Sequence, residues 1–179
     1  EGLTDEEIAL TKMSQAELQA NKILFGPLND DIPYIKCEVC VLLVSHLYEN
    51  ATYAWNQELE RIQNLENKKP TYRRKSRFNN DAMKGHFHTQ IGTLVDMNCD
   101  PRVRMHYWIE TIDIYKAGND IRLKTMDFKG KCRRECLTVI KACHMISESV
   151  DSELVDVMVN AVQQQEPLTA VVKHVCVDM

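Results

Sequence analysis

The strongest pattern in the chain is an apolar stripe that begins at Tyr34 and continues to about Asn64. Its members recur every three or four residues, which is the period of one helix face: Ile35, Val39, Leu42, Leu43, His46 and Leu47. The pattern predicts a long helix. Cys37 and Cys40 are three positions apart, so they lie on the same face of this helix.

The segment before this helix has a weaker pattern. Residues Leu3 to Ile23 predict a helix, with Thr4 as the N-cap and Glu7 in capping-box spacing. The apolar stripe is loose, so this helix suits a docking arm as well as a core element. Gly and Pro residues between 26 and 33 exclude a continuous helix. We therefore expect an N-terminal arm and linker over residues 1–33 and one domain over residues 34–179.

The next segment is polar and basic. Pro70 lies within it, and the composition predicts an exposed loop over about residues 67–84. A solvated loop is the simpler interpretation. The sharper hypothesis is a surface for an acidic protein or lipid headgroups, formed by Lys68, Lys69, Arg73, Arg74, Lys75 and Arg77.

The rest of the chain predicts further helices. They cover His86 to about Met97, Val103–Tyr115, Lys131–Gln164 as the longest, and Leu168–Val177. Between the second and third of these, "KAGND" predicts a turn and "IRLKTMDF" a short extended piece. The fold class expected from these elements is an all-α helical bundle that disulfides cross-link.

Length, charge and hydropathy exclude several classes of protein. The chain has 179 residues and a net charge of −4, as expected for one globular domain and unlike a nucleic-acid binder or a disordered tail. It contains no apolar run of 18 residues or more, so no membrane-spanning helix is predicted.

Seven cysteines are many for this length and favour an oxidising compartment. Because the number is odd, at least one is free, is bonded to another chain, or has a partner beyond Met179. Asn50-Ala51-Thr52 is an N-glycosylation sequon, which points in the same direction and makes Asn50 a candidate glycan site.

Three chemistries suit the Cys37-x-x-Cys40 pair. Structural zinc usually takes such a pair from a tight turn, whereas this pair opens an apolar helix. A redox pair follows a strand, which nothing before Tyr34 suggests, and the acidic Glu38 disfavours a thiolate. We favour two bridges from one helix face to other elements. Cys176 is an obvious partner, and Cys99 and Cys143 can form a further bridge.

Other candidate sites have simpler interpretations. The histidines show no zinc-binding spacing such as His-Glu-x-x-His, so we expect no metal. Acidic residues in the long C-terminal helix, Glu148, Asp151, Glu153 and Asp156, read as a solvated face. The chain has no glycine-rich phosphate loop and no G-x-S-x-G nucleophile motif. We expect no catalytic residue, no cofactor and no enzymatic activity.

The order of these motifs resembles the saposin-like fold, and more closely the canopy proteins of the endoplasmic reticulum lumen. The likeness rests on "CEVC" followed by an apolar helix, a long basic loop, "LVDMNC" ending at Cys99, and "ACHMISESVDSELVDVMV" from Ala142. It runs from about Tyr34 to Cys176. Two cysteines near the C-terminus are typical of the family, and only Cys176 occurs here.

The resemblance implies a disulfide framework. It pairs Cys99 with Cys143 and Cys40 with Cys176, and it leaves Cys37 to a residue beyond Met179. Cys132 and Cys136 are additional to the family pattern. They are one helical turn apart, so a strained bridge within the helix can form.

The resemblance also implies a function. We expect a non-catalytic protein that binds a client or partner protein in the endoplasmic reticulum lumen or after secretion. One alternative is an accessory structural subunit of a large membrane-associated assembly, and a second is saposin-type lipid binding. The thylakoid lumen and the mitochondrial intermembrane space also permit disulfides, and Asn50 would carry no glycan there.

Overall fold

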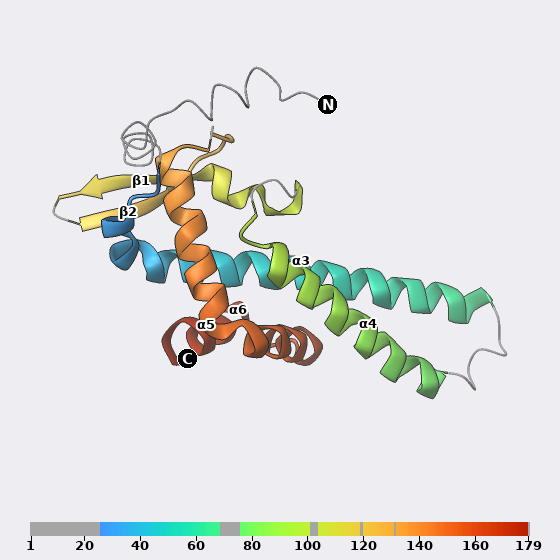
Figure 1. The fold of residues 1–179 in the computed structure, drawn as a ribbon. Helices are drawn as coiled ribbons and strands as arrows, with labels where there is room; N and C mark the ends of the chain where they lie inside the picture. The colour runs from blue at the N-terminus through green and yellow to red at the C-terminus, as the bar shows by residue number, and fades with distance from the viewer. Residues whose placement is uncertain (1–25, 69–75, 101–103, 119, 131, 179) are drawn as a thin grey trace, which may run out of the picture.

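Helices form most of the chain in the computed structural model, which describes residues 26–68, 76–100, 104–118, 120–130 and 132–178 (Figure 1). The helix expected over Leu3–Ile23 lies outside these residues. In chain order the elements are a 3-10 turn η1 (Asn29–Asp31), α3 (Ile32–Lys68), α4 (Ser76–Met97), a 3-10 helix η3 (Arg104–Thr111), β1 (Ile112–Ala117), β2 (Asp120–Thr125), α5 (Arg134–Gln164), α6 (Leu168–Lys173) and a π-helical turn η4 (His174–Asp178).

The apolar stripe that begins at Tyr34 belongs to α3, the central helix. It begins at Ile32, so Pro33 falls in the first turn, where its missing N–H costs no hydrogen bond. The boundary expected after residue 33 therefore lies inside a helix. The residues just before α3 also pack on the domain. Leu28 N donates to Thr138 Oγ1 at 2.8 Å, and Lys141 Nζ donates to Asn29 Oδ1 at 2.6 Å.

Helix α4 begins at Ser76, ten residues before the predicted start at His86. The second half of the loop predicted over 67–84 is therefore helical, and that prediction was wrong. The buried residues of α4 are spaced by four: Met83, Phe87, Ile91 and Val95. So narrow a buried stripe leaves a mostly polar sequence around it, which in the first half of the helix resembles a loop.

Helix α5 crosses α3 at a steep angle, and α4 runs beside the second half of α3 (Figure 1). Helix α5 ends as predicted at Gln164, but it begins at Arg134 and not at Lys131. With 31 residues it is shorter than the 37 of α3, so the expected order of length was wrong. Gln165 takes the left-handed conformation, φ 57°, and its N–H reaches the carbonyls of Ala161 and Val162, which closes the helix.

A two-stranded antiparallel sheet corrects the all-α prediction. The helix expected over Val103–Tyr115 is replaced by η3 and then by β1, which pairs with β2 in the register Ile114↔Leu123. In so short an apolar run, helical and alternating spacing cannot be told apart from sequence. The turn and the extended piece that follow are where they were expected, and Gly118 supplies the positive φ of 68° that the turn needs.

One carboxylate attaches this hairpin to α3. Glu38 Oε2 accepts a hydrogen bond from the backbone N–H of Leu123 at 2.7 Å, and Oε1 accepts one from Arg122 Nη1 at 3.0 Å. Arg122 also lies 3.6 Å from Asp120. The two carboxylates raise the pKa of the Arg122 guanidinium, mainly through the hydrogen bond with Glu38.

The core lies where α3, α4 and α5 meet. Fully buried side chains come from all three helices, among them Leu43, Phe87 and Leu154. Trp55 of α3 packs on Phe87 of α4 with 4.9 Å between ring centroids. None of the described helices combines the length and apolar character needed to cross a membrane.

Candidate functional site: a disulfide-clamped groove between α3 and α4

The first long-range disulfide joins Cys40 in α3 to Cys176 in η4, with 5.9 Å between the Cα atoms. It is one of the pairs that the canopy resemblance implies. Cys40 lies on the buried face of α3, whereas Cys176 is half-buried near the C-terminal end of the described chain. The bridge therefore holds the last helical turns against α3.

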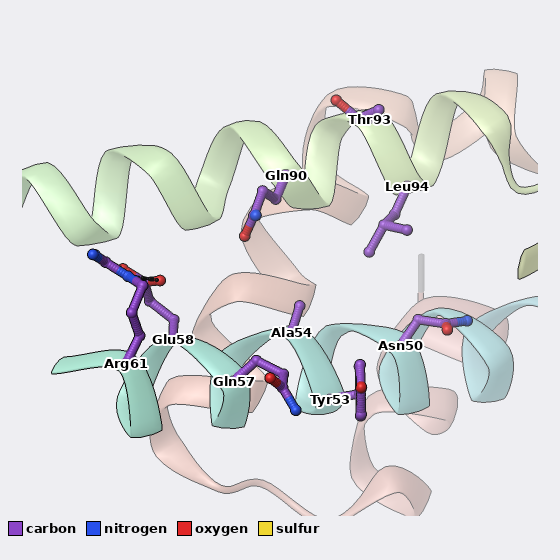
Figure 2. A pocket seen from close by; sticks show the side chains of 9 residues that line it. All are labelled: Asn50, Tyr53, Ala54, Gln57, Glu58, Arg61, Gln90, Thr93 and Leu94. Atoms are coloured by element: carbon purple, nitrogen blue, oxygen red, sulfur yellow. Dashed lines mark hydrogen bonds and ion pairs between the residues drawn. The ribbon is translucent and has the colours of Figure 1, made fainter. Parts of the chain in front are cut away.

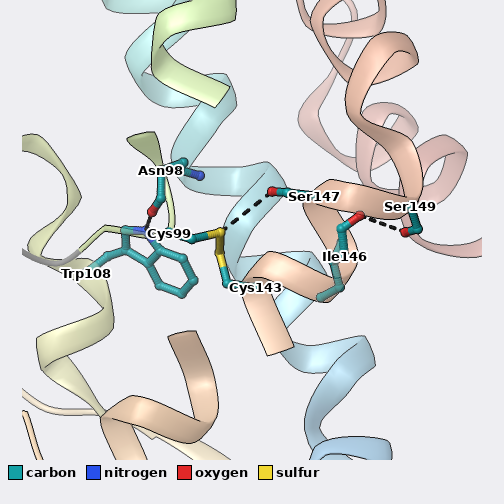
Figure 3. The surroundings of a disulfide bond; sticks show 7 residues. All are labelled: Asn98, Cys99, Trp108, Cys143, Ile146, Ser147 and Ser149. Atoms are coloured by element: carbon teal, nitrogen blue, oxygen red, sulfur yellow. Dashed lines mark hydrogen bonds between the residues drawn. A yellow bond between two sulfur atoms is a disulfide. The ribbon is translucent and has the colours of Figure 1, made fainter. Parts of the chain in front are cut away.

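The second disulfide joins Cys99, just after α4, to Cys143 in α5, and it is again a pair that the resemblance implies. Both residues are buried. Ser147, one turn further along α5, places its hydroxyl 3.6 Å from Cys99 Sγ (Figure 3). On the other side, Trp108 Nε1 donates to the carbonyl of Asn98 at 3.3 Å. This bridge fixes the end of α4 to the first half of α5.

The third disulfide joins Cys132 and Cys136 across 5.0 Å between Cα atoms. The sequence suggested a bridge within one helix. The structure differs, because α5 begins at Arg134 and Cys132 precedes it in non-helical backbone. Cys132 is exposed and Cys136 is buried. The bridge thus links the incoming chain to the first turn of α5.

The three bridges differ in how strongly they constrain the unfolded chain. Their sequence separations are 136, 44 and 4 residues. In the chain-entropy description these separations correspond to about 5, about 4 and about 2 kcal/mol of stabilisation. The two long-range bridges therefore stabilise the fold, and the third contributes least. Together they indicate an oxidising environment outside the cytosol.

Cys37 is the one cysteine without a bridge within the described residues, and it is exposed on α3, whereas Cys40 is buried. The expectation that the two cysteines share one face was therefore wrong. The expected partner of Cys37 beyond Met179 stays a prediction. Tyr34 and Val41, which share its helix face, are also exposed. Val177, next to the bonded Cys176, is exposed as well. We call these four residues the Cys37 surface.

A pocket of about 580 Å³ lies between the second half of α3 and α4 (Figure 2). Its floor is apolar: Ala54 points from α3 toward α4, and Leu94 points from α4 toward α3. Polar side chains surround this floor. We call the pocket the α3–α4 groove, and its lining consists of Asn50, Tyr53, Ala54, Gln57, Glu58, Arg61, Gln90, Thr93 and Leu94.

The polar groups of the groove are mainly neutral. Gln57 and Gln90 are exposed, and their carboxamides form no hydrogen bond with the described part of the chain. Each can therefore donate and accept one or more bonds to a ligand. Tyr53 is 62% exposed and adds an aromatic edge. Thr93 is less available, because its hydroxyl donates to the carbonyl of Thr89 at 3.1 Å.

At one end of the groove the opposite charges of Glu58 and Arg61 compensate each other. Arg61 donates from Nη2 to Glu58 Oε1 at 2.6 Å and from Nε to Glu58 Oε2 at 2.8 Å. The hydrogen bond from Arg61 lowers the pKa of the Glu58 carboxyl, against the opposing effect of burial. The pair gives the groove a polar end with little net charge.

Asn50, the predicted glycan site, lines the same groove. Its Nδ2, the atom that a glycan would modify, donates to the carbonyl of His46 at 2.8 Å. The hydroxyl of Thr52, the third residue of the sequon, is buried and makes no hydrogen bond among the described residues. A glycan on Asn50 would therefore start inside the groove and compete with any other occupant.

The predicted basic surface falls mostly outside the described residues. Lys69, Arg73, Arg74 and Lys75 belong to the segment between α3 and α4. Lys68 is the last residue of α3 and Arg77 lies in the first turn of α4, but their side chains are also outside the description. The hypothesis of an acidic partner or lipid surface there stays a prediction.

The acidic face of α5 contains one specific contact. Asp156 Oδ1 lies 2.9 Å from His88 Nε2 of α4, and both side chains are exposed. Across the part of the chain that the structure describes, no three His, Cys, Asp or Glu residues come together in a way that could hold a metal ion.

The comparisons leave the family open: no protein-family model, curated protein or solved structure matches the chain. The sequence analysis singled out Asn50 in this groove but missed the groove itself. A signal was present, because six lining residues of α3 recur with helical spacing: Asn50, Tyr53, Ala54, Gln57, Glu58 and Arg61. Because most are polar, that stripe reads as a solvated face.

Proposed function

We propose that the protein is a non-catalytic binding protein that holds an extended segment of a client polypeptide in the α3–α4 groove. The observation that carries this proposal is the lining of the groove, an apolar floor flanked by uncommitted carboxamides. A polypeptide backbone offers alternating N–H and C=O groups, and carboxamides can pair with both. An apolar side chain of the client would rest on Ala54 and Leu94.

The dimensions and charge of the groove support a peptide. On α3 the lining runs from Asn50 to Arg61, a span of eleven helical rises, which is about 17 Å of helix. An extended peptide of about five residues has this length. The paired Glu58 and Arg61 leave no strong field for an anionic or cationic ligand, which favours a neutral stretch of chain.

We further propose a saposin-like protein related to the canopy family, in the endoplasmic reticulum lumen or secreted. The disulfide pattern supports this setting, because Cys40–Cys176 and Cys99–Cys143 are the pairs that the resemblance implies. Clients with exposed extended segments are abundant where secreted proteins fold. The thylakoid lumen and the mitochondrial intermembrane space are the alternative locations.

Binding of a permanently unfolded model polypeptide tests the proposal. The probe is a reduced and carboxymethylated protein with a fluorescent label, titrated with the oxidised full-length chain. We expect saturable binding by the wild type. In Ala54→Arg and in Leu94→Arg the dissociation constant should rise about tenfold, which is a loss of about 1.4 kcal/mol of binding free energy. Each arginine fills the floor of the groove.

Val41→Arg is the matched control, because Val41 is an exposed apolar residue of α3 outside the groove. It should bind the probe like the wild type. Absence of binding by the wild type, or equal loss in all three variants, would show that the groove is not the binding site. Circular dichroism of each variant verifies that the fold is retained.

A second candidate function is that of a structural subunit, and the Cys37 surface favours it. Tyr34 and Val177 are 66% and 74% exposed, so this surface offers apolar contacts with an exposed thiol among them. Lipid binding, the third hypothesis, stays a prediction without a specific observation. Blocking Cys37 with a bulky maleimide would prevent assembly in a subunit and leave groove binding unchanged.

A further inference from the structure

The Cys132–Cys136 disulfide is placed differently from the other two. The other bridges join separate elements, and Cys99, Cys143 and Cys40 are all buried. Cys132 is exposed and lies in non-helical backbone, so an incoming thiol can reach it. Cys136 is only 5% exposed, in the first turn of α5. One sulfur is open to attack and the other is held inside.

The first turn of α5 suits a thiolate at Cys136. The residue that caps this helix, Arg133, makes no side-chain hydrogen bond to the first-turn N–H groups. Free N–H groups at a helix N-terminus stabilise a nearby anion. Arg133 and Arg134 add positive charge, and Glu135 cancels one of the two charges. These N–H groups and positive charges offset part of the cost of placing a thiolate at the buried Cys136.

The fold does not depend on this bridge to hold α5 in place. Arg134 Nε donates to the carbonyl of Gly26 at 3.3 Å, and Thr138 Oγ1 accepts from Leu28 N. Lys141 adds its bond to Asn29 one turn later. These contacts anchor the start of α5 to the segment before α3. None of these contacts involves either sulfur atom of the bridge.

We propose that Cys132–Cys136 is a site of thiol–disulfide exchange with protein thiols. A thiolate of the client attacks Cys132 Sγ, the Cys132–Cys136 bond breaks, and Cys136 leaves as a thiolate that takes up a proton. A second client thiol, as thiolate, attacks the client sulfur of the mixed disulfide and releases Cys132. Two client thiols are oxidised to one disulfide, and the bridge is reduced to two thiols.

The exchange goes beyond the binding function and does not rest on the groove. It takes place at the start of α5 beside the hairpin, whereas the groove lies between α3 and α4 (Figure 1). The class of substrate is a protein dithiol in an oxidising compartment. Each protein molecule oxidises one dithiol, and no other oxidant is needed for that single turnover.

The order in which the bridges open is the first test, in the full chain with Cys37→Ser to remove the free thiol. The oxidised protein is treated with reduced glutathione, alkylated at intervals and mapped by mass spectrometry. We expect Cys132–Cys136 to open at least about tenfold faster than the two long-range bridges, because access controls the rate of exchange. Glutathione should be found on Cys132. Glutathione on Cys136, or earlier opening of Cys99–Cys143, would overturn the proposal.

The second test uses a synthetic peptide with two cysteines. One equivalent of the Cys37→Ser protein should convert about one equivalent of the peptide dithiol to its disulfide. The triple variant Cys37→Ser/Cys132→Ser/Cys136→Ser is the control, with circular dichroism to verify its fold. Equal peptide oxidation by both proteins would contradict the proposal. The first test needs neither cysteine replaced, so it decides the question even if the control fails to fold.

Discussion

At the scale of single residues, Glu38 connects two parts of the molecule that the sequence does not relate. It lies inside the C-x-x-C motif, where its charge disfavoured a redox interpretation. In the structure its two oxygens instead receive Leu123 N and Arg122 Nη1 of the hairpin. The residue between the cysteines thus has a structural contact of its own, 84 and 85 positions away along the chain.

Glu38→Ala should loosen the hairpin. The change removes the acceptor of the Leu123 N–H, and a lost hydrogen bond of this kind lowers the free energy of unfolding by about 1 kcal/mol. Urea denaturation measures this loss, and hydrogen exchange of the Leu123 amide should accelerate. Asp120→Asn is the control, because Asp120 contacts Arg122 and not the Leu123 N–H. This change should alter the free energy of unfolding by no more than about 0.5 kcal/mol. An equal effect of the two changes would contradict the assignment.

Arg61→Ala should raise the pKa of Glu58 toward its usual value, because it removes the hydrogen bond that lowers it. The folded-state pKa of Glu58 lies below its unfolded value. The pair therefore stabilises the fold above the unfolded pKa, and this contribution disappears as pH falls through the folded pKa. At neutral pH the variant should lose about 0.2–0.5 kcal/mol, as for helix pairs of this spacing.

Titration of the Glu58 carboxyl carbon by NMR measures this shift directly. The wild-type midpoint should lie below that of Arg61→Ala. Identical midpoints would show that Arg61 does not set the charge of this end of the groove. Arg133→Ala, at the start of α5, is the control that should leave the Glu58 midpoint unchanged.

At the scale of elements, α3 and α4 together form both a core interface and a groove. The buried contact is that of Trp55 with Phe87, whereas the groove is lined by neighbouring residues such as Ala54 and Gln90. The aromatic contact joins the two helices next to the groove. We therefore expect its loss to alter the shape of the groove.

Phe87→Ala should change the shape of the groove and destabilise the fold. Replacing a fully buried phenylalanine by alanine costs about 3–5 kcal/mol. Thermal unfolding measures the loss, and binding of the unfolded probe should weaken with it. Tyr53→Ala separates the two effects: Tyr53 is exposed and lines the groove, so its loss should weaken binding and change stability by less than about 0.5 kcal/mol. A stable Phe87→Ala would contradict the role of this contact.

The elements that could be predicted from sequence are those with a dense apolar stripe. Helix α3 was predicted because Ile35, Val39 and Leu43 repeat every four residues in its first half. The start of α4 could not be predicted from the sequence, because Met83 and Phe87 lie among polar residues that face solvent. The first strand of the hairpin was misread for a different reason: Ile112 fits a helical stripe as well as an alternating strand, and pairing with β2 decides between them. The groove could not be predicted from the sequence, because a polar stripe on α3 does not indicate which helix packs opposite it.

At the scale of the whole molecule, two long-range bridges cross-link the fold. Cys40–Cys176 fixes the C-terminal turns to α3, and Cys99–Cys143 fixes α4 to α5. The resemblance implied both pairs, and the structure contains both. The relation to the canopy family itself stays a prediction, as do the partner of Cys37 and the compartment.

Replacing bridged pairs by alanine should rank the three disulfides. We expect losses of about 5 kcal/mol for Cys40/Cys176, about 4 for Cys99/Cys143 and about 2 or less for Cys132/Cys136. Guanidinium denaturation of the three double variants measures the order. A larger loss for Cys132/Cys136 than for Cys99/Cys143 would show that the short bridge is structural, and would also weaken its assignment to thiol exchange.

The bridge between Cys40 and Cys176 has a mechanical consequence. A force that pulls residue 26 away from residue 178 is transmitted along the chain to Cys40, through the sulfur–sulfur bond to Cys176, and from there to residue 178. The 135 residues between them form a covalent ring that carries no tension. While the bond lasts, α4, the hairpin and α5 cannot be stretched out by pulling on the two ends. Reduction of that single bond places α3, α4 and the later part of α5 under load, whereas the segment between Cys99 and Cys143 stays bypassed by the second bridge.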